Sequence, residues 1–513
     1  MPVTLTDVAL TASAIIAARW LYQKSSAQSQ HHPPGPPGLP LVGNVMDMPA
    51  EEAWLVYKRW SDQYSSDVIR LNVLGTNIIV VNSFEAAADL FDKKSTIYND
   101  RPHMTMLYDL IGFGWAVAFT PYGDRWRDMR KAFHQDFNPD SAKQFNEIEV
   151  KAVHELLQRL IQKPSGFMEH ARHMAGRIIM RSAYGIDIQP HDDPYIEIGE
   201  KSLQALSAST NAGSYLVDMM PILRYVPYWF PGANFQVQAK NWRPWVSAML
   251  HDPFENIKKR MHTGDAPECA ATALLEDLDK IDNTDRKNYM ESVIRTTLGS
   301  MYAGGADTTV SALGTFILAM LLHPEVQERA RAQIDAVVGT DGLPSFSDRP
   351  FLPYIDAVMN ETLRWKPVLH LDIPHLLTKD DVYKGYFIPK GSVIVGNTWA
   401  VLHDERAYPE PSKFNPDRFM LNGELNPDVR DPDAVFGFGR RICPGRFMAK
   451  ESMWIAMAMI LAALDIRPVK NNKGKDIIPV VEYEPGLVAY PKPFEVDIQP
   501  RSPEHAALIA EFV

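Results

Sequence analysis

Cysteine is nearly absent from this chain, which has only Cys269 and Cys443 among its 513 residues. Two cysteines cannot build a disulfide framework, so the composition fits a reducing compartment. The sequence also lacks a basic tract, a zinc-ligand spacing, a phosphate-binding loop and a nicotinamide fingerprint. A formal net charge of −11 at pH 7 further argues against a nucleic-acid partner.

One of the two cysteines lies in a glycine-rich segment, residues 436–445, which reads FGFGRRICPG. Gly437 and the other glycines let the backbone turn sharply, lie flat against a planar cofactor and aim amide N–H groups at the sulfur of Cys443. Arg440 and Arg441 add positive charge that favours a thiolate and could meet carboxylates of the cofactor. The pattern predicts an iron ligand, although a cysteine in such a turn is also found as a buried small hydrophobe.

A second element is a predicted helix within residues 352–364, whose apolar positions 355, 358, 359 and 362 form one stripe. Glu361 and Arg364 lie one turn apart on it and can pair. On an exposed face such a pair contributes only about 0.2–0.5 kcal/mol, so the spacing by itself is compatible with a solvated surface pair.

The third element is a long apolar stretch from about Arg286 to Leu322, stopped by a proline at 324, which predicts one long helix of roughly 50 Å at 1.5 Å per residue. Gly304 and Gly305 lie within it, and each glycine costs about 1 kcal/mol relative to alanine. They would leave a groove for a ligand beside Asp307 and the next residue. Tight helix packing on small residues is the alternative.

The spacing of Phe436, Gly439, Arg441, Cys443 and Gly445 closely resembles the haem-binding loop of the cytochrome P-450 superfamily. The resemblance extends over nearly the whole chain, and several stretches look most like fungal microsomal secondary-metabolite hydroxylases. It implies a mainly α fold with a smaller β region (α+β) and a long central helix over the cofactor. It also implies haem b, with its iron ligated by Cys443.

The same resemblance implies roles for residues in the other two elements. Glu361, Arg364 and Arg418 would form a buried charge network that locks the loop presenting Cys443. Removing one partner of a buried ion pair costs roughly 3–5 kcal/mol, so Glu361→Ala is expected to lose haem. In the long helix, Asp307 would relay protons from solvent and Thr308 would hold dioxygen. The structural alternative is a hydrogen bond from Thr308 to the preceding turn of the helix.

Further haem contacts are also implied by resemblance. Trp126 and Arg130 resemble residues of the helix that binds the other side of the haem, although that helix also reads as an amphipathic surface element. His375 falls where the superfamily carries a propionate-binding His or Arg. The remaining expected cofactor contacts belong to the cysteine loop: Phe436, Gly437, Arg441 and Gly445.

The implied activity is monooxygenation of a small lipophilic molecule, such as a terpenoid or an aromatic compound, with dioxygen as co-substrate. The chain has no flavin or nicotinamide site of its own, so the resemblance implies electrons from NADPH through a separate NADPH–haemoprotein reductase. The surface of this chain on which the reductase docks would include Arg127, Lys131, Arg440 and Arg446. The alternative is that these are ordinary solvated surface charges. Rival functions are a haem-thiolate isomerase, dehydratase or peroxygenase, and a non-catalytic haem sensor.

The first residues read as a marginal membrane segment, because 5–22 is mostly apolar and just long enough to span a bilayer. Arg19 and Lys24 at its end place the rest of the chain in the cytosol by the positive-inside rule. We expect an anchor at 1–24, a proline-rich hinge at 25–40 and one catalytic domain at 41–513, single-pass in the endoplasmic reticulum membrane. A cleaved signal peptide is the competing interpretation.

The resemblance also places three segments around the substrate: about 101–119, 368–373 and 486–490. The first is rich in methionine and aromatic residues, which indicates an apolar, adaptable cavity or ordinary core. His370 and Asp372 in the second segment are polar where related proteins usually carry small apolar residues, so they are expected to contact the substrate, with a solvent-facing or haem-supporting role as the alternative. Residues 221–232 are dense in aromatics and prolines and are expected to dip into the membrane interface.

Local patterns predict the surrounding elements. Alternation at 69–73 and the run 78–81 predict a β-hairpin, followed by a helix capped by Ser83. Helices are expected at 142–163 and 324–338, and strands near 382–395 and 478–496.

Overall fold

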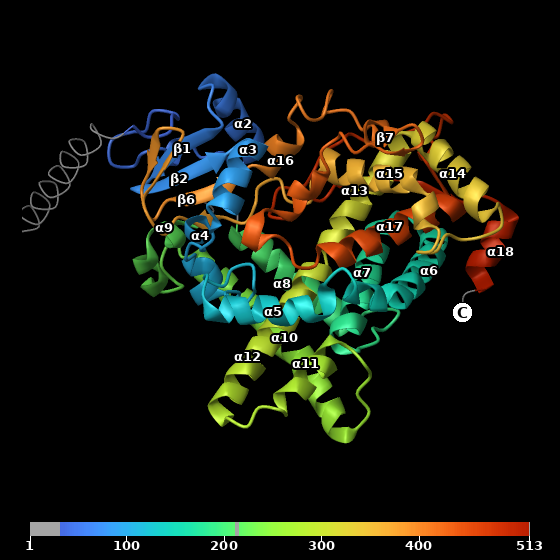
Figure 1. Cartoon of the computed structure of the whole chain (residues 1–513), viewed down its shortest axis with the longest axis horizontal. Helices are drawn as coiled ribbons and strands as arrows, with labels where there is room; N and C mark the ends of the chain where they lie inside the picture. The colour runs from blue at the N-terminus through green and yellow to red at the C-terminus, as the bar shows by residue number, and fades with distance from the viewer. Residues whose placement is uncertain (1–30, 211–214, 512–513) are drawn as a thin grey trace, which may run out of the picture. The chain divides into compact units, whose positions relative to one another are not determined.

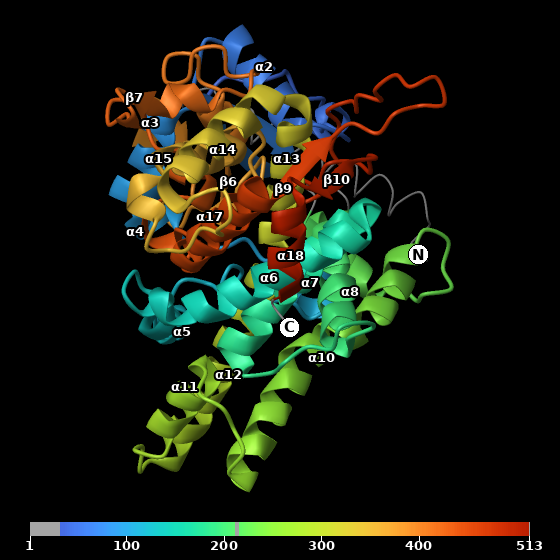
Figure 2. The same cartoon turned by 90° about the vertical axis from the view of Figure 1, so that its right-hand side faces the viewer.

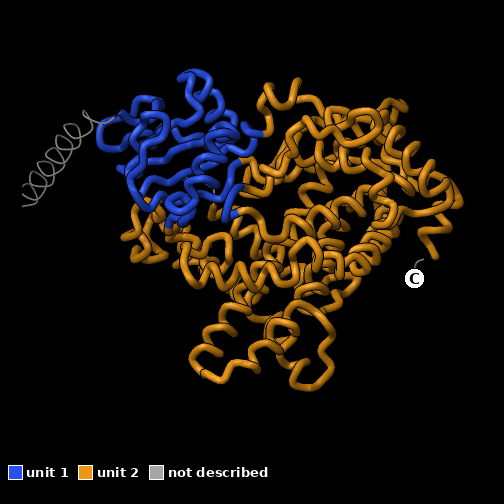
Figure 3. Tube along the Cα trace, in the orientation of Figure 1, with its two compact units in different colours: residues 1–102, 371–401, 438–441 blue, residues 103–370, 402–437, 442–513 orange. Residues whose placement is uncertain are grey.

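The computed structural model describes residues 31–210 and 215–511, which form two compact units (Figure 3). Unit 1 takes in the described residues up to Pro102 together with Leu371–Val401 and Phe438–Arg441. Unit 2 takes in His103–His370, Leu402–Gly437 and the described residues from Ile442 onward. The expected anchor at 1–24 lies outside the described residues, and the division into anchor, hinge and catalytic domain stays a prediction.

Unit 1 is built on a four-stranded sheet in the order β1 (Val68–Val73), β2 (Thr76–Val81), β6 (Val393–Gly396), β3 (His375–Leu376). β1 and β2 form the predicted antiparallel hairpin, and β2 pairs in parallel with β6. The Ser83 side chain accepts a hydrogen bond from the Ala86 N–H at 3.1 Å, so the predicted cap is confirmed. The sheet places His375 on its edge strand.

Short helices and a second hairpin complete unit 1. The strands expected near 382–395 are confirmed, because β4 (Asp381–Tyr383) pairs with β5 (Tyr386–Ile388) just before β6. The other elements are α2 (Ala53–Gln63), α3 (Phe84–Ala87), α4 (Ser95–Tyr98), α16 (Thr398–Leu402, ending one residue into unit 2), 3₁₀ turns at Val45–Asp47 and Gly439–Arg441, and a π-helical turn at Ala88–Lys93.

Unit 2 is mainly helical (Figure 1). Its helices are α5 (Asp124–Phe137), α6 (Asn146–Gln162), α7 (Phe167–Tyr184), α8 (Pro194–Thr210), α9 (Leu216–Met219), α10 (Asn234–Thr263), α11 (Ala270–Leu278), α12 (Thr284–Gly305), α13 (Thr308–Leu322), α14 (Pro324–Val338), α15 (Pro353–Trp365), α17 (Arg446–Ala463) and α18 (Pro503–Glu511). A 3₁₀ turn at Ser141–Phe145 leads into α6, so the predicted helix at 142–163 starts in a different helical form. The prediction for α14 is confirmed at both ends.

The long helix predicted from Arg286 to Leu322 is present but interrupted. It consists of α12 and α13, separated by Ala306 and Asp307, where the backbone of Asp307 leaves the helical region (φ −140°, ψ −26°). α12 lies against α5, α7, α10 and α11, as the two views show (Figures 1 and 2). Among the described residues, Thr284–Leu322 is the one stretch long and apolar enough to cross a membrane, and 78% of its most apolar window is buried, as in a core helix.

The prediction of strands at 478–496 is wrong. Within that range the structure has only an isolated bridge between Tyr483 and Pro491. Prolines at 479, 485, 491 and 493 lack the N–H groups that a strand ladder needs. The last strand, β10 (Asp497–Pro500), begins just after them and pairs with β9 (Leu464–Arg467). Together with β7 (Met420–Leu421) and β8 (Glu424–Leu425), these pairs are the small sheets of unit 2.

Candidate functional site

Cys443 ends a turn that is tied back to the preceding 3₁₀ helix, Pro432–Phe436. Its amide donates to the Phe436 carbonyl at 2.8 Å, and the intervening Gly437 has a φ of +84° that favours glycine. The residue after Gly445 begins α17, so the first amides of an 18-residue helix follow the cysteine directly. The expected geometry of a turn aimed at a sulfur atom is therefore present.

The surroundings of the Cys443 thiol shift its pKa in two opposing directions. Burial raises its pKa above the ordinary value of 9.0, whereas hydrogen bonds from the Gly445 and Arg446 amides and the positive charges of Arg130 and Arg446 lower the pKa. Cys443 is half-buried, and a sulfur that faces amide groups and arginines in such a place is set up for negative charge. This donor set fits a thiolate that binds a metal cation, since a cation would offset the cost of burial.

Arg130 on α5 reaches the cysteine turn, because its Nη1 donates to the Ile442 carbonyl at 2.7 Å. Its guanidinium lies 5.7 Å from the centre of the Trp126 ring, and the Trp126 side chain is 6% exposed. Burial lowers the pKa of Arg130, and the Cys443 sulfur partly offsets this. Trp126 and Arg130 are therefore inward-facing residues beside Cys443, not members of a solvated amphipathic surface.

His375 and Arg441 belong to unit 1 and bond to adjacent carbonyls of one segment. His375 Nδ1 lies 2.7 Å from the Tyr98 carbonyl, and Arg441 Nε donates to the Asn99 carbonyl at 2.7 Å. Burial, aided by the charge of Arg101, lowers the pKa of His375 well below its ordinary value. A neutral ring that donates from Nδ1 leaves Nε2 to meet a ligand, and a carboxylate there would favour the charged ring.

Arg101 supports this group and was missed by sequence reasoning. Its Nη1 donates to the Ile373 and Pro374 carbonyls at 2.5 and 2.8 Å, so it fixes the residues just before His375. No spacing in the sequence connects position 101 to position 375, since the fold brings the two segments together, as in the pairing of Asp100 with Leu376.

Glu361, Arg364 and Arg418 form one ion-pair cluster in unit 2. Arg364 makes a two-pronged contact with the Glu361 carboxylate at 2.7 and 2.9 Å, and Arg418 Nε reaches the same carboxylate at 3.1 Å. Glu361 and Arg364 are fully buried. The pair is therefore not a solvated surface pair.

The cluster also holds the chain that leads toward the cysteine turn. Glu361 accepts from the Asn415 amide at 2.7 Å, and Arg364 donates to the carbonyls of Leu402 and Lys413 at 3.1 and 3.2 Å. α15 additionally packs on Pro432–Phe436, the 3₁₀ helix that precedes Gly437. The Glu361–Arg364 pair thus holds the chain at Leu402 and at Lys413–Asn415, and its helix supports the segment before Gly437.

Asp307 occupies the break between α12 and α13 and is held by two partners. Arg172 Nε on α7 contacts Oδ1 at 3.3 Å, and the hydroxyl of Tyr490 donates to Oδ2. Burial raises the pKa of Asp307, while Arg172 and Tyr490 oppose the rise. Sequence reasoning identified the acid but neither partner, because residues 172, 307 and 490 share no sequence pattern.

Thr308 donates a hydrogen bond from Oγ1 to the Gly304 carbonyl at 2.8 Å. This is the bond to the preceding turn that was the structural alternative to holding dioxygen. The two glycines differ in their surroundings. A Cβ at Gly305 would lie 2.8 Å from Ile179 Cγ1, so Gly305 permits close packing of α7. Gly304 is exposed, and nothing lies within 4 Å of a Cβ built there. Open space beside a mostly buried helix fits a bound group of substantial size.

The segments expected around the substrate are largely buried. Met106, Leu107, Ile111 and Phe113 have no exposed surface, which matches core as well as a closed cavity. Asp372 accepts from the Gly396 amide at 2.7 Å within unit 1, so it supports its own sheet. Burial lowers the pKa of His370 to about 3 and holds the ring neutral. Their contact with substrate stays a prediction.

Comparison with known proteins agrees with this mainly helical, cysteine-centred arrangement. The profile of the cytochrome P-450 family matches residues 33–498. A zebrafish cytochrome P-450 solved with abiraterone superposes with a TM-score of 0.70 at 24% identity, covering 88% of this chain and 100% of that one. The fold is therefore that of the haem-thiolate proteins.

Relatives in fungi share much more of the sequence. A cytochrome P-450 monooxygenase of Armillaria gallica is 40% identical over 98% of this chain and 99% of its own length. Another from Postia placenta is 43% identical over 93% and 92%, and tryptamine 4-monooxygenase of Psilocybe cyanescens is 40% identical over 92% and 93%. This chain belongs to the cytochrome P-450 family.

Family membership settles the class of chemistry. The protein is a haem-thiolate monooxygenase, an oxidoreductase that uses dioxygen and receives electrons from a redox partner. The expected fold, mainly helical with small sheets and a long central helix, is confirmed.

Proposed function

We propose that Cys443 supplies the thiolate that ligates the haem iron of this monooxygenase. The observation that carries the proposal is the half-buried Cys443, whose sulfur accepts from the Gly445 and Arg446 amides at the start of α17 and lies near the charge of Arg130. Cys269, the other cysteine, caps α11 and contacts the Thr272 hydroxyl at 3.6 Å, so it already has a structural role.

The other proposed haem contacts are polar side chains in each of the two units. Arg130, stacked over Trp126, and separately Arg441 and His375 would bind the haem carboxylates, since these side chains are cationic or become so beside an anion. Phe436, Gly437 and Gly445 would lie along the macrocycle. A Cβ at Gly437 would come no closer than 3.9 Å to its nearest neighbour, so a flat group has room there.

Asp307 and Thr308 would deliver protons to dioxygen. When bound, haem supplies the activation of dioxygen, and a cysteine ligand favours cleavage of the O–O bond. The reaction takes up two electrons and two protons, puts one oxygen atom into the substrate and releases the other as water. Thr308 would move its hydroxyl from the Gly304 carbonyl to the reacting oxygen, and Asp307 would restore its proton.

The specific partners are proposed from the same relatives. Electrons would come from NADPH through an NADPH–haemoprotein reductase that docks on the Cys443 side of unit 2, at Arg127, Lys131 and Arg446. Arg440, which belongs to unit 1, would be a further contact. The substrate would be a small lipophilic molecule of fungal secondary metabolism, terpenoid or aromatic. One relative is a tryptamine 4-monooxygenase, which supports the aromatic choice.

The enzyme would be anchored once in the endoplasmic reticulum membrane, with its catalytic part in the cytosol. A patch of exposed large side chains supports contact with lipid, since Ile222, Tyr225, Tyr228 and Trp229 are 67–71% exposed. We call Leu216–Phe230 with these side chains the apolar patch. Aromatic residues of this kind gather at membrane–water interfaces.

The difference spectrum of the reduced, carbon monoxide-bound protein tests the proposal. The wild type is expected to show the strongly red-shifted Soret band of thiolate ligation, and Cys443→Ser to lose it. Cys269→Ser is the matched control and should keep the band. A histidine-type spectrum in the wild type, or an unchanged band in Cys443→Ser, would reject Cys443 as the ligand.

A further inference from the structure

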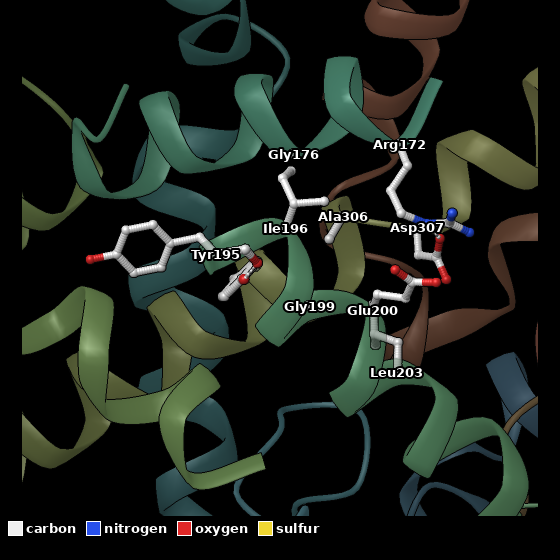
Figure 4. A pocket seen from close by; sticks show the side chains of 10 residues that line it. Arg172, Gly176, Tyr195, Ile196, Gly199, Glu200, Leu203, Ala306 and Asp307 are labelled. Atoms are coloured by element: carbon white, nitrogen blue, oxygen red, sulfur yellow. Dashed lines mark hydrogen bonds and ion pairs between the residues drawn. The ribbon is translucent and has the colours of Figure 1, made fainter. Parts of the chain in front are cut away.

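A small cavity opens beside Asp307 between α7, α8 and α12. It is lined by Arg172, Gly199, Glu200, Leu203, Tyr302 and Asp307, among others, and is just large enough for a water molecule (Figure 4). Most of its exposed lining is apolar, and the charged side chains among the lining residues are Arg172, Glu200 and Asp307, to which such a water would hydrogen-bond. The cavity is therefore a place where a proton can pass between side chains that do not touch.

Glu200 is the second carboxyl group that lines this cavity, and the proposed reaction has not yet used it. The Glu200 side chain reaches from α8 toward Asp307, and Arg172 on α7 contacts the Asp307 carboxylate (Figure 4). Glu200 is partly exposed, whereas the Asp307 side chain is only 13% exposed and both of its oxygens are engaged. Glu200 is thus better placed than Asp307 to exchange protons with bulk water.

The charges around Asp307 couple it to Glu200. The groups that face it are Arg172 on α7, Glu200 on α8 and Tyr490 on the C-terminal segment. The negative charge of Glu200 adds to the rise in the pKa of Asp307 that burial causes, while the other two oppose it. Asp307 can therefore hold a proton at a pH where an exposed aspartate has lost it.

We propose that Glu200 is the proton-entry residue of this enzyme, taking protons from solvent and passing them through the cavity to Asp307. The inference rests on the proposed role of Asp307. Each transfer moves one proton from the Glu200 carboxyl to water in the cavity and one from that water to the Asp307 carboxylate, so no other reactant is needed. Glu200 is then reprotonated from solvent.

The test compares the holoenzyme with Glu200→Gln, which keeps the shape of the side chain but cannot exchange a proton in this way. Reductase-supported turnover is expected to fall about tenfold, with a larger rate ratio between H₂O and D₂O. Glu197→Gln, an exposed residue one turn earlier on α8, is the matched control and should behave like the wild type. Glu200→Asp restores a carboxylate and should recover part of the rate.

A second readout needs no turnover. The infrared band of the protonated Asp307 carboxyl, identified by its loss in Asp307→Asn, reports the pH at which Asp307 ionises. Glu200→Gln removes a negative neighbour, so this midpoint is expected to move to lower pH, and Glu197→Gln should leave it in place.

The two readouts separate the two proposals. Wild-type turnover in Glu200→Gln overturns the role of Glu200, wherever the midpoint lies. If the wild type itself formed no product, the proposed function would fail. The infrared midpoint would still test the coupling, because an unchanged Asp307 midpoint in Glu200→Gln would overturn it independently of turnover.

Discussion

At the scale of single residues, burial decides what the ionisable side chains of this protein do. Asp372 is an example: its two polar neighbours are the Gly396 amide and the charge of Arg101, yet burial outweighs both and raises its pKa to about 7. The sequence was compatible with a contact to substrate, a solvent-facing position or support of the haem. The hydrogen bond to Gly396 supplies a structural role without testing contact with substrate.

This pKa predicts how Asp372 affects stability. The folded-state pKa of about 7 lies above the ordinary 3.8, so the folded chain keeps a proton that the unfolded chain has lost, and stability falls as pH rises through that window. Asp372→Asn imitates the protonated form and keeps an acceptor for Gly396. It should be more stable than the wild type by roughly 2–4 kcal/mol at pH 8 and nearly equal at pH 4.

Urea unfolding at both pH values measures this difference. Asp92→Asn, an exposed aspartate of unit 1, is the control and should change stability little at either pH. An Asp372→Asn protein less stable than the wild type at pH 8 would mean that the ionised carboxylate stabilises the fold.

At the scale of elements, one buried carboxylate links α15 to two later stretches of chain. Glu361 accepts from Arg364, Arg418 and the Asn415 amide, so its loss leaves two guanidinium groups without their carboxylate. The pairing of Glu361 with Arg364 was readable from their spacing on a predicted helix. The contact with Arg418, 57 positions away, came from family resemblance, because no helical or strand period relates the two.

Glu361→Ala is therefore expected to lose roughly 3–5 kcal/mol of stability and to be isolated with little haem. Haem absorbance per protein and urea unfolding are the measurements. Glu328→Ala, on the exposed face of α14, removes a carboxylate of the same kind and should keep both haem and stability. Soluble Glu361→Ala protein with a full complement of haem would contradict the expected role of the cluster.

Local pattern predicted some elements well and others poorly. The hairpin of β1 and β2 was predictable because its period of two and its Gly75 turn lie within one continuous stretch, residues 68–81. The break in the long helix at Asp307 was not, since Arg172 and Tyr490 hold that residue from distant parts of the chain. The failure at 478–496 has a local cause, the prolines, which outweighed the apolar run.

At the scale of the whole molecule, exposed apolar surface gathers in one part of unit 2. The apolar patch includes Trp229 and Phe230, which are 71% and 53% exposed. Side chains of this size stabilise a soluble protein little when exposed, whereas at a bilayer surface they can bury their rings. The patch thus adds a second proposed membrane contact to the N-terminal segment.

The chain from residue 31 onward is expected to bind lipid vesicles through this patch. Replacing Tyr228, Trp229 and Phe230 with serine should reduce co-sedimentation with vesicles about tenfold or more, because each buried side chain contributes on the order of 1 kcal/mol or more. The control replaces three other exposed apolar residues, Ile477, Ile478 and Val480. Equal loss in both variants would show that the patch has no special affinity for lipid.

The sequence by itself determined the class of this protein. The ten-residue segment around Cys443 holds three glycines and two arginines, and an acid–alcohol pair follows Gly304 and Gly305. Both patterns resemble those of one family and are local, because neighbouring residues must adopt one backbone turn around one cofactor. Charge, composition and the scarcity of cysteine excluded other classes for the same reason: they are properties of the chain and need no fold.

Only the tertiary structure decided which groups surround those patterns. Arg101, Arg172, Glu200 and Tyr490 lie far in sequence from the residues they serve, and side-chain contacts across such separations form only when helices and strands pack. Burial, too, is a property of the packed chain, so the raised pKa values of Asp307 and Asp372 had no signal in the sequence. Local order follows from neighbours along the chain, whereas the protonation of a site follows from neighbours in space.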